Sequence, residues 1–376
     1  MNKALFVAKL EHRLRPLLAQ AVSPEKFVKI YSRTRPWFLD MLSTCRPHAY
    51  APFRPVEVCG VKFRNDLMNA AGFDKDAKLL PFNYLSGAGG GVIGTVLDDI
   101  HEGNQIDAFG KKSNPWTPLP RSHSALNSLG LPNYGVDYVV SRVLEFREQF
   151  QPIDFPVVAS LMGHPKEKNE RLKLQGIVYS LDKLLPVVDM IEINESCPNT
   201  AHSHDDLELR LKTVLSVRDS YKDRYGKYVP IFVKMRDAGD PEYTVEFMTY
   251  VGVDGLVLTN TQIDYANYRQ KLHPDDRELF DYYTEKHKGG MSGPIIKDFA
   301  FSQVDAVVRA IGRQSSLLKV IHVGGLDSSA DMWQSRSLDN NVVLREWYTG
   351  LMTSFGTRPV ETIYNNMVFG GKYPKK

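Results

Sequence analysis

From residue 61 onward, short apolar runs rich in β-branched residues alternate with segments of helical periodicity, and this alternation most constrains the fold. We count eight such runs, which predict a parallel (β/α)8 barrel of about 250 residues plus insertions. An open doubly wound sheet is the alternative, but it would carry a GxGxxG turn after its first strand, and none is there. The predicted strands are Leu67–Ala70, Gly91–Val96, Pro156–Ser160, Asp189–Asn194, Val229–Lys234, Asp254–Thr259, Lys319–Val323 and Val342–Trp347.

Two segments are too long for ordinary connections of a barrel, namely Asp98–Leu126 and Ile263–Gly290. Long loops of this kind usually serve as lids or as surfaces for a partner. We therefore expect both segments to act as lids or as partner surfaces.

The first 55 residues differ from the rest and form a predicted helical extension, with the barrel domain spanning residues 56–376. The stretches "ALFVAKLEHRLRPLLAQA" and "PEKFVKIYSRTRPWFLDMLS" place apolar residues at helical spacing, with basic residues on the other face. Ser23 and Pro24 predict the start of the second helix, as its cap and its first residue. The helices either pack on the barrel, or their apolar face docks on a membrane or lines a hydrophobic tunnel.

Composition narrows the classes of partner. The 47 basic and 44 acidic residues give a net charge of +3, which is too balanced to predict a nucleic-acid partner but is compatible with an anionic small substrate. The three cysteines, Cys45, Cys59 and Cys197, cannot form a disulfide framework and lack the spacing of a zinc site, so we expect a reducing compartment and no metal. No apolar run reaches the ~20 residues of a membrane span, and the start does not resemble a secretory signal. We expect a cytoplasmic protein, or one peripheral on the inner face of a membrane.

Polar residues follow nearly every predicted strand, where the carboxyl ends of barrel strands face one pocket. One lysine or asparagine there would usually cap a turn, but two lysines and three asparagines on one rim indicate a ligand site. In chain order the candidates are Gly72, Lys75, Thr95, Ser160, Asn194, Ser196, Cys197, Asn199, Thr200, Lys234, Asn260, Thr261, Gly324, Gly325, Thr349 and Gly350.

Two glycine-rich pieces, "GGMSGP" (289–294) and "GGLDSS" (324–329), favour a phosphorylated cofactor. Each exposes backbone N–H groups before a helix start, at the places where barrels bind phosphate. Lys234 ends an otherwise apolar strand, where it would be costly to bury without an anionic or electron-rich partner. A reduced flavin ring, which gathers negative charge near N1, would suit it.

The asparagines describe a second ligand. Asn127, Asn194, Asn199 and Asn260 supply amide donors and acceptors, and Lys75 adds a cation, which together suit a small planar molecule with amide edges and a carboxylate. Cys197 is then either an inert buried thiol or the group on its loop that removes a proton.

In order along residues 56–370, eight motifs resemble the dihydroorotate dehydrogenase family: "NAAGFDKDA", "LNSLGLPNYGVDY", "INESCPNT", "PIFVKM", "LTNT", "GGMSGP", "VGGLDS" and "YTGL". These enzymes oxidise dihydroorotate to orotate with FMN, in pyrimidine synthesis. The resemblance implies Cys197 as the base for the C5 proton, hydride transfer from C6 to flavin N5, and Lys234 beside the reduced flavin. It implies FMN binding by Ala71, Gly72, Lys234, Gly293, Gly325, Tyr348 and Thr349, to which strand-end position adds Thr95 and Gly324. It implies orotate binding by Lys75, Asn127, Gly130, Leu131, Asn194, Asn199, Asn260 and Thr261.

The class within this family is mixed. Cys197 matches the cysteine base of the soluble class 1 enzymes, whereas the N-terminal helices, Thr200 and Tyr348 resemble the membrane-associated class 2 enzymes that use quinones. The stretch "NPWTPLPR" (114–121) lacks the arginine expected soon after "NP", and "NTAHSHDD" (199–206) lacks the usual Pro-Gly. We expect a quinone that approaches past the N-terminal helices, with fumarate or a partner flavoprotein as alternatives.

Two rival functions stay open. One is a related FMN barrel that acts on another dihydropyrimidine. Lys75 discriminates between the two functions, because only a substrate with a carboxylate needs that cation. The other is a flavin-binding barrel without turnover, for which a ring of asparagines would have no use.

Overall fold

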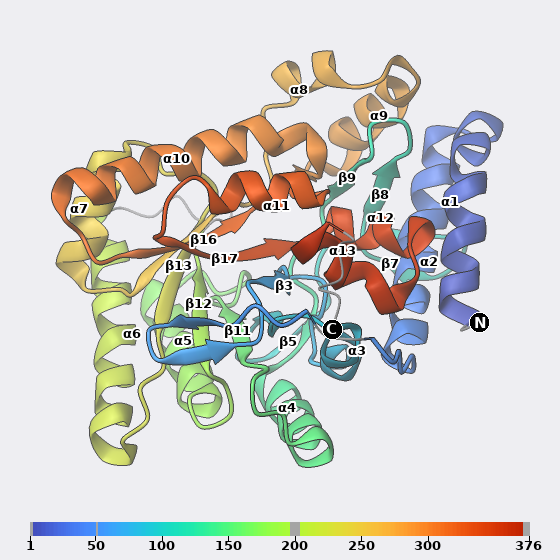
Figure 1. Cartoon of the computed structure of the whole chain (residues 1–376). Coiled ribbons are helices and arrows are strands. Elements are labelled where there is room, and N and C mark those ends of the chain that lie inside the picture. The colour runs from blue at the N-terminus through green and yellow to red at the C-terminus, as the bar shows by residue number, and fades with distance from the viewer. Residues whose placement is uncertain (1–2, 50–51, 196–203, 371–376) are drawn as a thin grey trace.

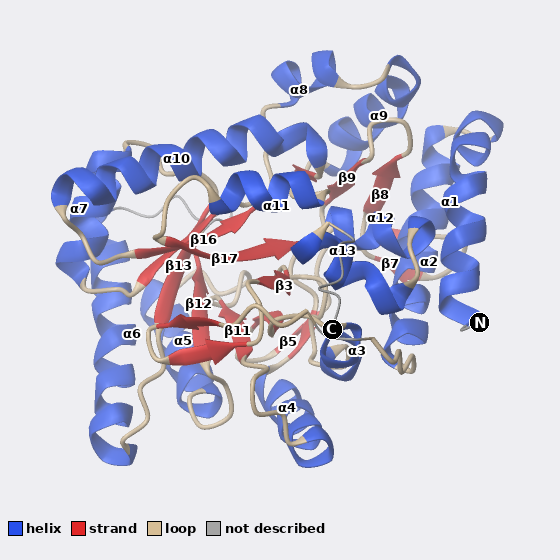
Figure 2. Cartoon of the chain, viewed as in Figure 1, coloured by secondary structure: helices blue, strands red, loops and turns tan. Residues whose placement is uncertain are grey.

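A computed structural model of the protein describes residues 3–49, 52–195 and 204–370. Its centre is an eight-stranded parallel sheet in the order β3-β17-β16-β14-β13-β12-β11-β4, surrounded by helices (Figures 1 and 2). The predicted (β/α)8 barrel is therefore confirmed, with strand bounds within two residues of the prediction. The strands are β3 (Leu67–Asn69), β4 (Gly91–Val96), β11 (Val157–Leu161), β12 (Met190–Asn194), β13 (Ile231–Met235), β14 (Gly255–Leu258), β16 (Lys319–Val323) and β17 (Val342–Trp347).

Helices follow these strands along the chain and cover the outside of the sheet. They are α3 (Leu80–Ser86), α4 (Val136–Phe150), α5 (Glu170–Leu184), α6 (His204–Tyr225), α7 (Pro241–Val251), α10 (Lys297–Gln314), α11 (Ser329–Arg336) and α12 (Thr349–Thr357), with α13 (Ile363–Phe369) at the end. Between β3 and β4 the side chain of Asn69 takes the place of a strand neighbour. Its amide donates to the carbonyl of Val92 at 2.6 Å and accepts from the Val92 N–H at 3.2 Å.

One buried apolar residue from each strand fills the barrel interior: Met68, Val92, Val158, Met190, Phe232, Val257, Ile321 and Leu344. Val58 and Phe63 join this cluster from the hairpin of β1 (Val56–Val58) and β2 (Val61–Phe63), which covers the amino-terminal end of the barrel. Because side chains alternate along a strand, the residue two positions further along points the same way. That next layer contains Glu192, Lys234 and Glu346.

The two long segments form one layer beyond the carboxyl ends of the strands. The first contains β5 (Ile100–His101), β6 (Ile106–Asp107), β7 (Lys112–Ser113) and β8 (Trp116–Leu119) and ends within β9 (Ser124–Asn127), with β10 (Asn133–Tyr134) soon after it, and the second contains α8 (Tyr265–Lys271) and α9 (Arg277–His287). They meet in an antiparallel sheet, in which β15 (Gly290–Ser292) pairs with β9 and β9 with β8. The sequence did not predict this sheet, because strands of two to four residues carry too little alternation.

The N-terminal helices α1 (Lys3–Ala21) and α2 (Pro24–Ser43) have the predicted bounds, and the Ser23 side chain accepts from the Lys26 N–H at 3.4 Å. Phe27, Val28 and Tyr31 of α2 share a buried core with β8, β9, α8 and α9, while α1 lies against α12. The Ser32 hydroxyl donates to the Trp116 carbonyl at 3.2 Å and accepts from its N–H at 3.0 Å, which fixes α2 on β8. The domain boundary at residue 55 stays a prediction.

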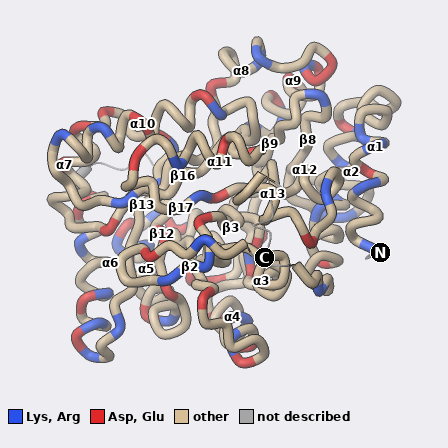
Figure 3. The backbone as a smooth tube through the Cα atoms, in the orientation of Figure 1, with Lys and Arg blue, Asp and Glu red and all other residues tan. Residues whose placement is uncertain are grey.

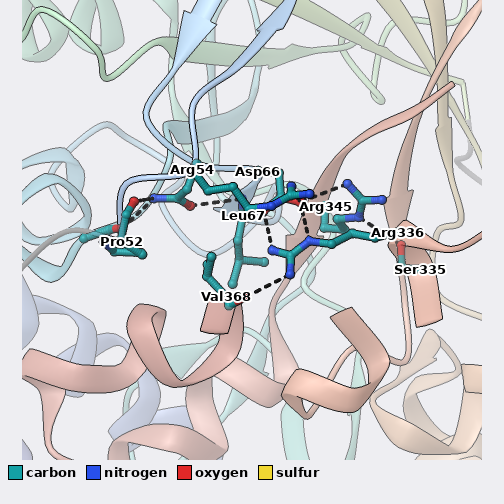
Figure 4. Close-up of polar contacts among 10 residues, drawn as sticks. Pro52, Arg54, Asp66, Leu67, Ser335, Arg336, Arg345 and Val368 are labelled. Atoms are coloured by element: carbon teal, nitrogen blue, oxygen red, sulfur yellow. Dashed lines mark hydrogen bonds and ion pairs between the residues drawn. The ribbon is translucent and has the colours of Figure 1, made fainter. Parts of the chain in front are cut away.

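Asp66, just before β3, is fully buried and binds three arginines from separate parts of the chain (Figure 4). Arg336 of α11 donates to both carboxylate oxygens, at 2.7 and 2.8 Å, and Arg345 of β17 and Arg54 each donate at 3.1 Å. Burial alone would raise the pKa of Asp66, but the arginines outweigh it and lower that pKa. This cluster ties the first and last strands of the barrel to α11.

Candidate active site

A cavity of about 600 Å³ opens at the carboxyl ends of the barrel strands, and the residues predicted to bind FMN or orotate within the described chain line it, whereas the strand-end candidates Ser160 and Gly350 do not. The predicted residues that line it are Ala71, Gly72, Lys75, Thr95, Asn127, Gly130, Leu131, Asn194, Lys234, Asn260, Thr261, Gly293, Gly324, Gly325, Tyr348 and Thr349. The structure brings together residues from seven barrel strands and from both insertions. Cys197 and Asn199, with Ser196 and Thr200, lie outside the described residues.

The amide groups are held by short contacts around the cavity. Asn194 donates to the Thr95 hydroxyl at 3.0 Å, and that hydroxyl lies 3.3 Å from the hydroxyl of Ser160. Asn127 comes from β9 rather than from a barrel strand, and its amide donates to the Gly290 carbonyl at 3.3 Å. Asn104 and Trp116 of the first long segment also line the cavity, so this segment and the residue that follows it are part of the site wall.

Lys75 is one of the cationic side chains that line the cavity. Burial, followed by repulsion from Arg35, lowers the pKa of Lys75 to about 7. Within the described part of the chain no carboxylate forms an ion pair with its ammonium group. A half-buried cation with this environment suits a ligand that brings its own negative charge.

Lys234 lies on the cavity floor between two carboxylates. Its Nζ atom is 3.4 Å from Glu192 of β12 and 3.3 Å from Glu346 of β17, and all three side chains are at most 5% exposed. Burial disfavours the charge on Lys234, but the two carboxylates outweigh burial and raise its pKa. The sequence suggested a bound ligand as the partner of Lys234, whereas the structure shows that the protein itself supplies two.

The glycine-rich segments have the close approaches that a phosphate cradle requires. A Cβ atom on Gly325 would lie 2.3 Å from the Lys297 Cα, and its φ is 71°. Gly293 has φ 103°, and a Cβ atom there would lie 2.9 Å from the Ser124 Cα. Both glycines adjoin the first residues of α10 or α12, whose N–H groups lack intrahelical partners. These features fit the phosphate end of a cofactor.

Arg35 is a site residue that the sequence did not indicate. It is 8% exposed, and its guanidinium donates to the Tyr348 hydroxyl at 2.6 and 3.1 Å and to the Gly72 carbonyl at 3.3 Å. It therefore reaches from α2 to two residues predicted to bind the cofactor. The helical pattern showed that α2 is amphipathic, but it did not show which residue meets the barrel.

A second cavity of about 210 Å³ lies between α1, α2 and the barrel. It is mostly apolar, with Val7, Leu18, Ile30 and Phe38 among its lining residues. Trp116, Tyr348 and Thr349 line both cavities. The two cavities therefore meet at these residues, beside Arg35.

Two of the cysteines are unsuited to proton removal. Burial raises the pKa of the Cys59 thiol to about 11 and also raises that of Cys45. Neither thiol lines either cavity. Cys197 stays the candidate that the sequence proposed.

Fold and site together define a (β/α)8 barrel with a cavity at the carboxyl ends of its strands, lined by lysine and asparagine side chains and by glycine-rich turns, and with a second, apolar cavity. A sequence profile described as dihydroorotate dehydrogenase matches residues 55–349. The chain therefore belongs to the dihydroorotate dehydrogenase family, whose members are oxidoreductases that carry a flavin.

Relatives and solved structures agree with this assignment. The chain is 29% identical over 288 residues to a dihydroorotate dehydrogenase (quinone) of Marinomonas sp. (strain MWYL1), covering 74% of this chain and 75% of that protein. It is 28% identical over 310 residues to the enzyme of the same name from Polaromonas naphthalenivorans (strain CJ2), covering 79% and 81%. A crystal structure of the Eimeria tenella dihydroorotate dehydrogenase in complex with ferulenol has a TM-score of 0.71 at 19% identity, covering 89% of this chain and 90% of that one, and shares the fold.

Proposed function

We propose that this enzyme oxidises dihydroorotate to orotate, with FMN as its flavin and a quinone as its electron acceptor. One observation carries the proposal: the predicted FMN and orotate groups within the described chain line a single cavity. Lys75 provides a cation for the carboxylate of the substrate, and the asparagines provide partners for its amide edges. Bound FMN would supply the two-electron acceptor for the hydride that leaves C6.

Cys197 is our proposed base for the C5 proton. It follows β12, which delivers Asn194 to the cavity, and a thiolate there could take the proton as the hydride leaves. Lys234, held by Glu192 and Glu346, places a fixed positive charge where negative charge grows during reduction.

Anaerobic stopped-flow reduction tests this function. Dihydroorotate should bleach the bound flavin, and Cys197→Ala should slow bleaching by about 10²- to 10⁴-fold while FMN stays bound. Cys59→Ala is the matched control and should react normally, because Cys59 lies outside the cavity. Unchanged bleaching in Cys197→Ala would remove this base. Bleaching by dihydrouracil but not by dihydroorotate would favour the rival substrate class.

The apolar second cavity supports the quinone. A quinone ring is planar and apolar, and this cavity reaches Tyr348 and Thr349 at the edge of the proposed flavin site. Thr34 is an exposed residue that lines the cavity, so Thr34→Trp should lower kcat/KM for the quinone without slowing flavin reduction. Asp40→Trp, exposed on the same helix but outside the cavity, should leave both rates unchanged. Equal kcat/KM values for the quinone in both variants would contradict a quinone site in this cavity and favour fumarate or a partner flavoprotein as the electron acceptor.

We further propose that α1 and α2 touch a membrane, where quinones dissolve. Phe6, Leu10, Leu14 and Leu17 form a stripe on α1 and are between 47% and 62% exposed. Lys and Arg outnumber Asp and Glu on the two helices by eight to three, as the blue segments in Figure 3 indicate. This combination is typical of a helix that lies in the interface of an anionic membrane. None of the helices among the described residues is long and apolar enough to cross a bilayer.

A further inference from the structure

The floor of the main cavity holds three ionisable side chains that come from three different strands. Glu192 is on β12, Lys234 on the adjacent β13, and Glu346 on β17, which is separated from β13 by β16 and β14 (Figure 2). Lys234 and Glu346 line the cavity, and the apolar interior of the barrel lies directly below them. We call these three residues the floor triad.

Charge balance makes the floor triad unusual. Two carboxylates and one ammonium group leave one net negative charge when all three are ionised, and an uncompensated buried charge is costly. The Oε1 atom of Glu346 also lacks a hydrogen-bond donor among the described residues, whereas both oxygens of Glu192 lie within 3.5 Å of the Lys234 ammonium group. A single proton bound by the floor triad would remove the net charge and supply one missing donor.

Glu346 is the member that would hold this proton, because it lines the cavity, Glu192 does not, and both Glu192 oxygens already face the Lys234 ammonium group. Burial raises the pKa of Glu346 to about 8, and Lys234 on β13 opposes this rise while Glu192 on β12 adds to it. The neighbouring strands β3 and β16 contribute Ala70 and Val323 to the same wall and no charge. The titration of Glu346 therefore depends on its two partners and on the charge of whatever lies in the cavity.

We propose that Glu346 is a positioning residue that acts through Lys234 and binds one proton from water when the cavity gains negative charge. The proposal rests on the proposed function, because it needs a redox cofactor above Lys234. Addition of two electrons and one proton to a bound isoalloxazine adds one negative charge to the cavity. Above pH 8, the Glu346 carboxylate would then take one further proton from solvent and become a neutral acid, so that reduction consumes two protons instead of one.

The pH dependence of the flavin midpoint potential tests this proposal without using dihydroorotate. The holoenzyme is reduced with dithionite against redox dyes between pH 6 and pH 10. In the wild type the reduction equilibrium should change by an additional tenfold per pH unit above pH 8, which is about 30 mV. Glu346→Gln should lose this break and match the wild type at pH 6.5, where both side chains are neutral.

Two further variants keep the test decisive. Asp74→Asn removes another fully buried carboxyl with a raised pKa, one that lies outside the floor triad, and should leave the break in place. Glu192→Gln leaves a balanced Lys234–Glu346 pair, so the break should move below pH 8. Glu192→Gln also provides a test of the proposal if Glu346→Gln does not retain its cofactor.

The results separate this proposal from the proposed function. A break that persists in Glu346→Gln, or a potential shifted equally at pH 6.5 and pH 9.5, would overturn proton exchange by Glu346. A break that depends on Glu346, in an enzyme that dihydroorotate does not bleach, would support the floor triad and overturn the substrate.

Discussion

The charge on Lys75 should set the pH dependence of orotate binding. The ammonium group is the form that binds a carboxylate, and with a pKa of about 7 it is present below pH 7 and lost above it. The apparent Kd should double at pH 7 and rise about 11-fold at pH 8 and about 100-fold at pH 9, because the charged fraction falls tenfold per unit. Below pH 6 the affinity should be constant.

Replacing the lysine should remove this dependence. Lys75→Met loses a charge-assisted hydrogen bond worth about 1.5–3 kcal/mol, which corresponds to a Kd about 10- to 150-fold weaker at pH 6. Its Kd should then stay flat up to pH 9, where it approaches that of the wild type. Isothermal titration of the FMN-loaded protein with orotate measures both curves.

Two controls isolate the carboxylate. Uracil lacks that group, so its affinity should not follow the Lys75 titration. Lys78→Met removes a nearby lysine that pairs with Asp76 outside the cavity, and it should retain the wild-type curve. The reasoning fails if Lys75→Met keeps the wild-type slope above pH 7, or if the wild type binds orotate equally at pH 6 and pH 9.

Three other predictions concern separate parts of the molecule. Asp66→Asn should lower the free energy of unfolding in urea by about 3–5 kcal/mol at pH 7, because it leaves buried guanidinium groups uncompensated. The half-exposed Arg54→Gln should cost under about 1 kcal/mol. Because folding lowers the pKa of Asp66, its contribution to the free energy of unfolding should be complete above pH ~4 and should fade below it. Equal free energies of unfolding for Asp66→Asn and the wild type at neutral pH would contradict this prediction. Arg35→Met should slow reoxidation by quinone in stopped-flow assays and leave reduction by dihydroorotate unchanged; slowing of both steps alike would argue against a role at the junction of the cavities. Leu10→Glu should reduce cosedimentation with anionic lipid vesicles, whereas Leu144→Glu, equally exposed on α4, should not.

The barrel could be predicted from sequence because its strands are buried on both faces. Runs such as Lys319–Val323 and Val342–Trp347 are rich in apolar and β-branched residues, and their predicted bounds match β16 and β17. The position of the site could be predicted from the same strands, because polar residues directly after them must meet at one end of a barrel. Lys75, Asn194 and Asn260 were found in this way.

Other site residues escaped prediction for different reasons. Arg35 comes from a helix whose pattern shows one apolar face but not the element packed against it. Glu192 and Glu346 did carry a signal, because each is a charge inside a strand that is buried, as Lys234 is, although β17 also carries Arg345. The argument applied to Lys234 would have indicated all three residues.

The contact between Arg35 and Tyr348 has a consequence for how the enzyme is made. The two residues are 313 positions apart, so the helix that carries Arg35 leaves the ribosome long before its partner exists. At 5–20 residues per second the delay is roughly 15–60 s. During this time the Arg35 guanidinium lacks its hydroxyl partner, although β8 and β9, which pack on the apolar face of α2, have already been made. The hydrogen bond that joins α2 to a residue shared by the two cavities can therefore form only after the last barrel strand has been synthesised.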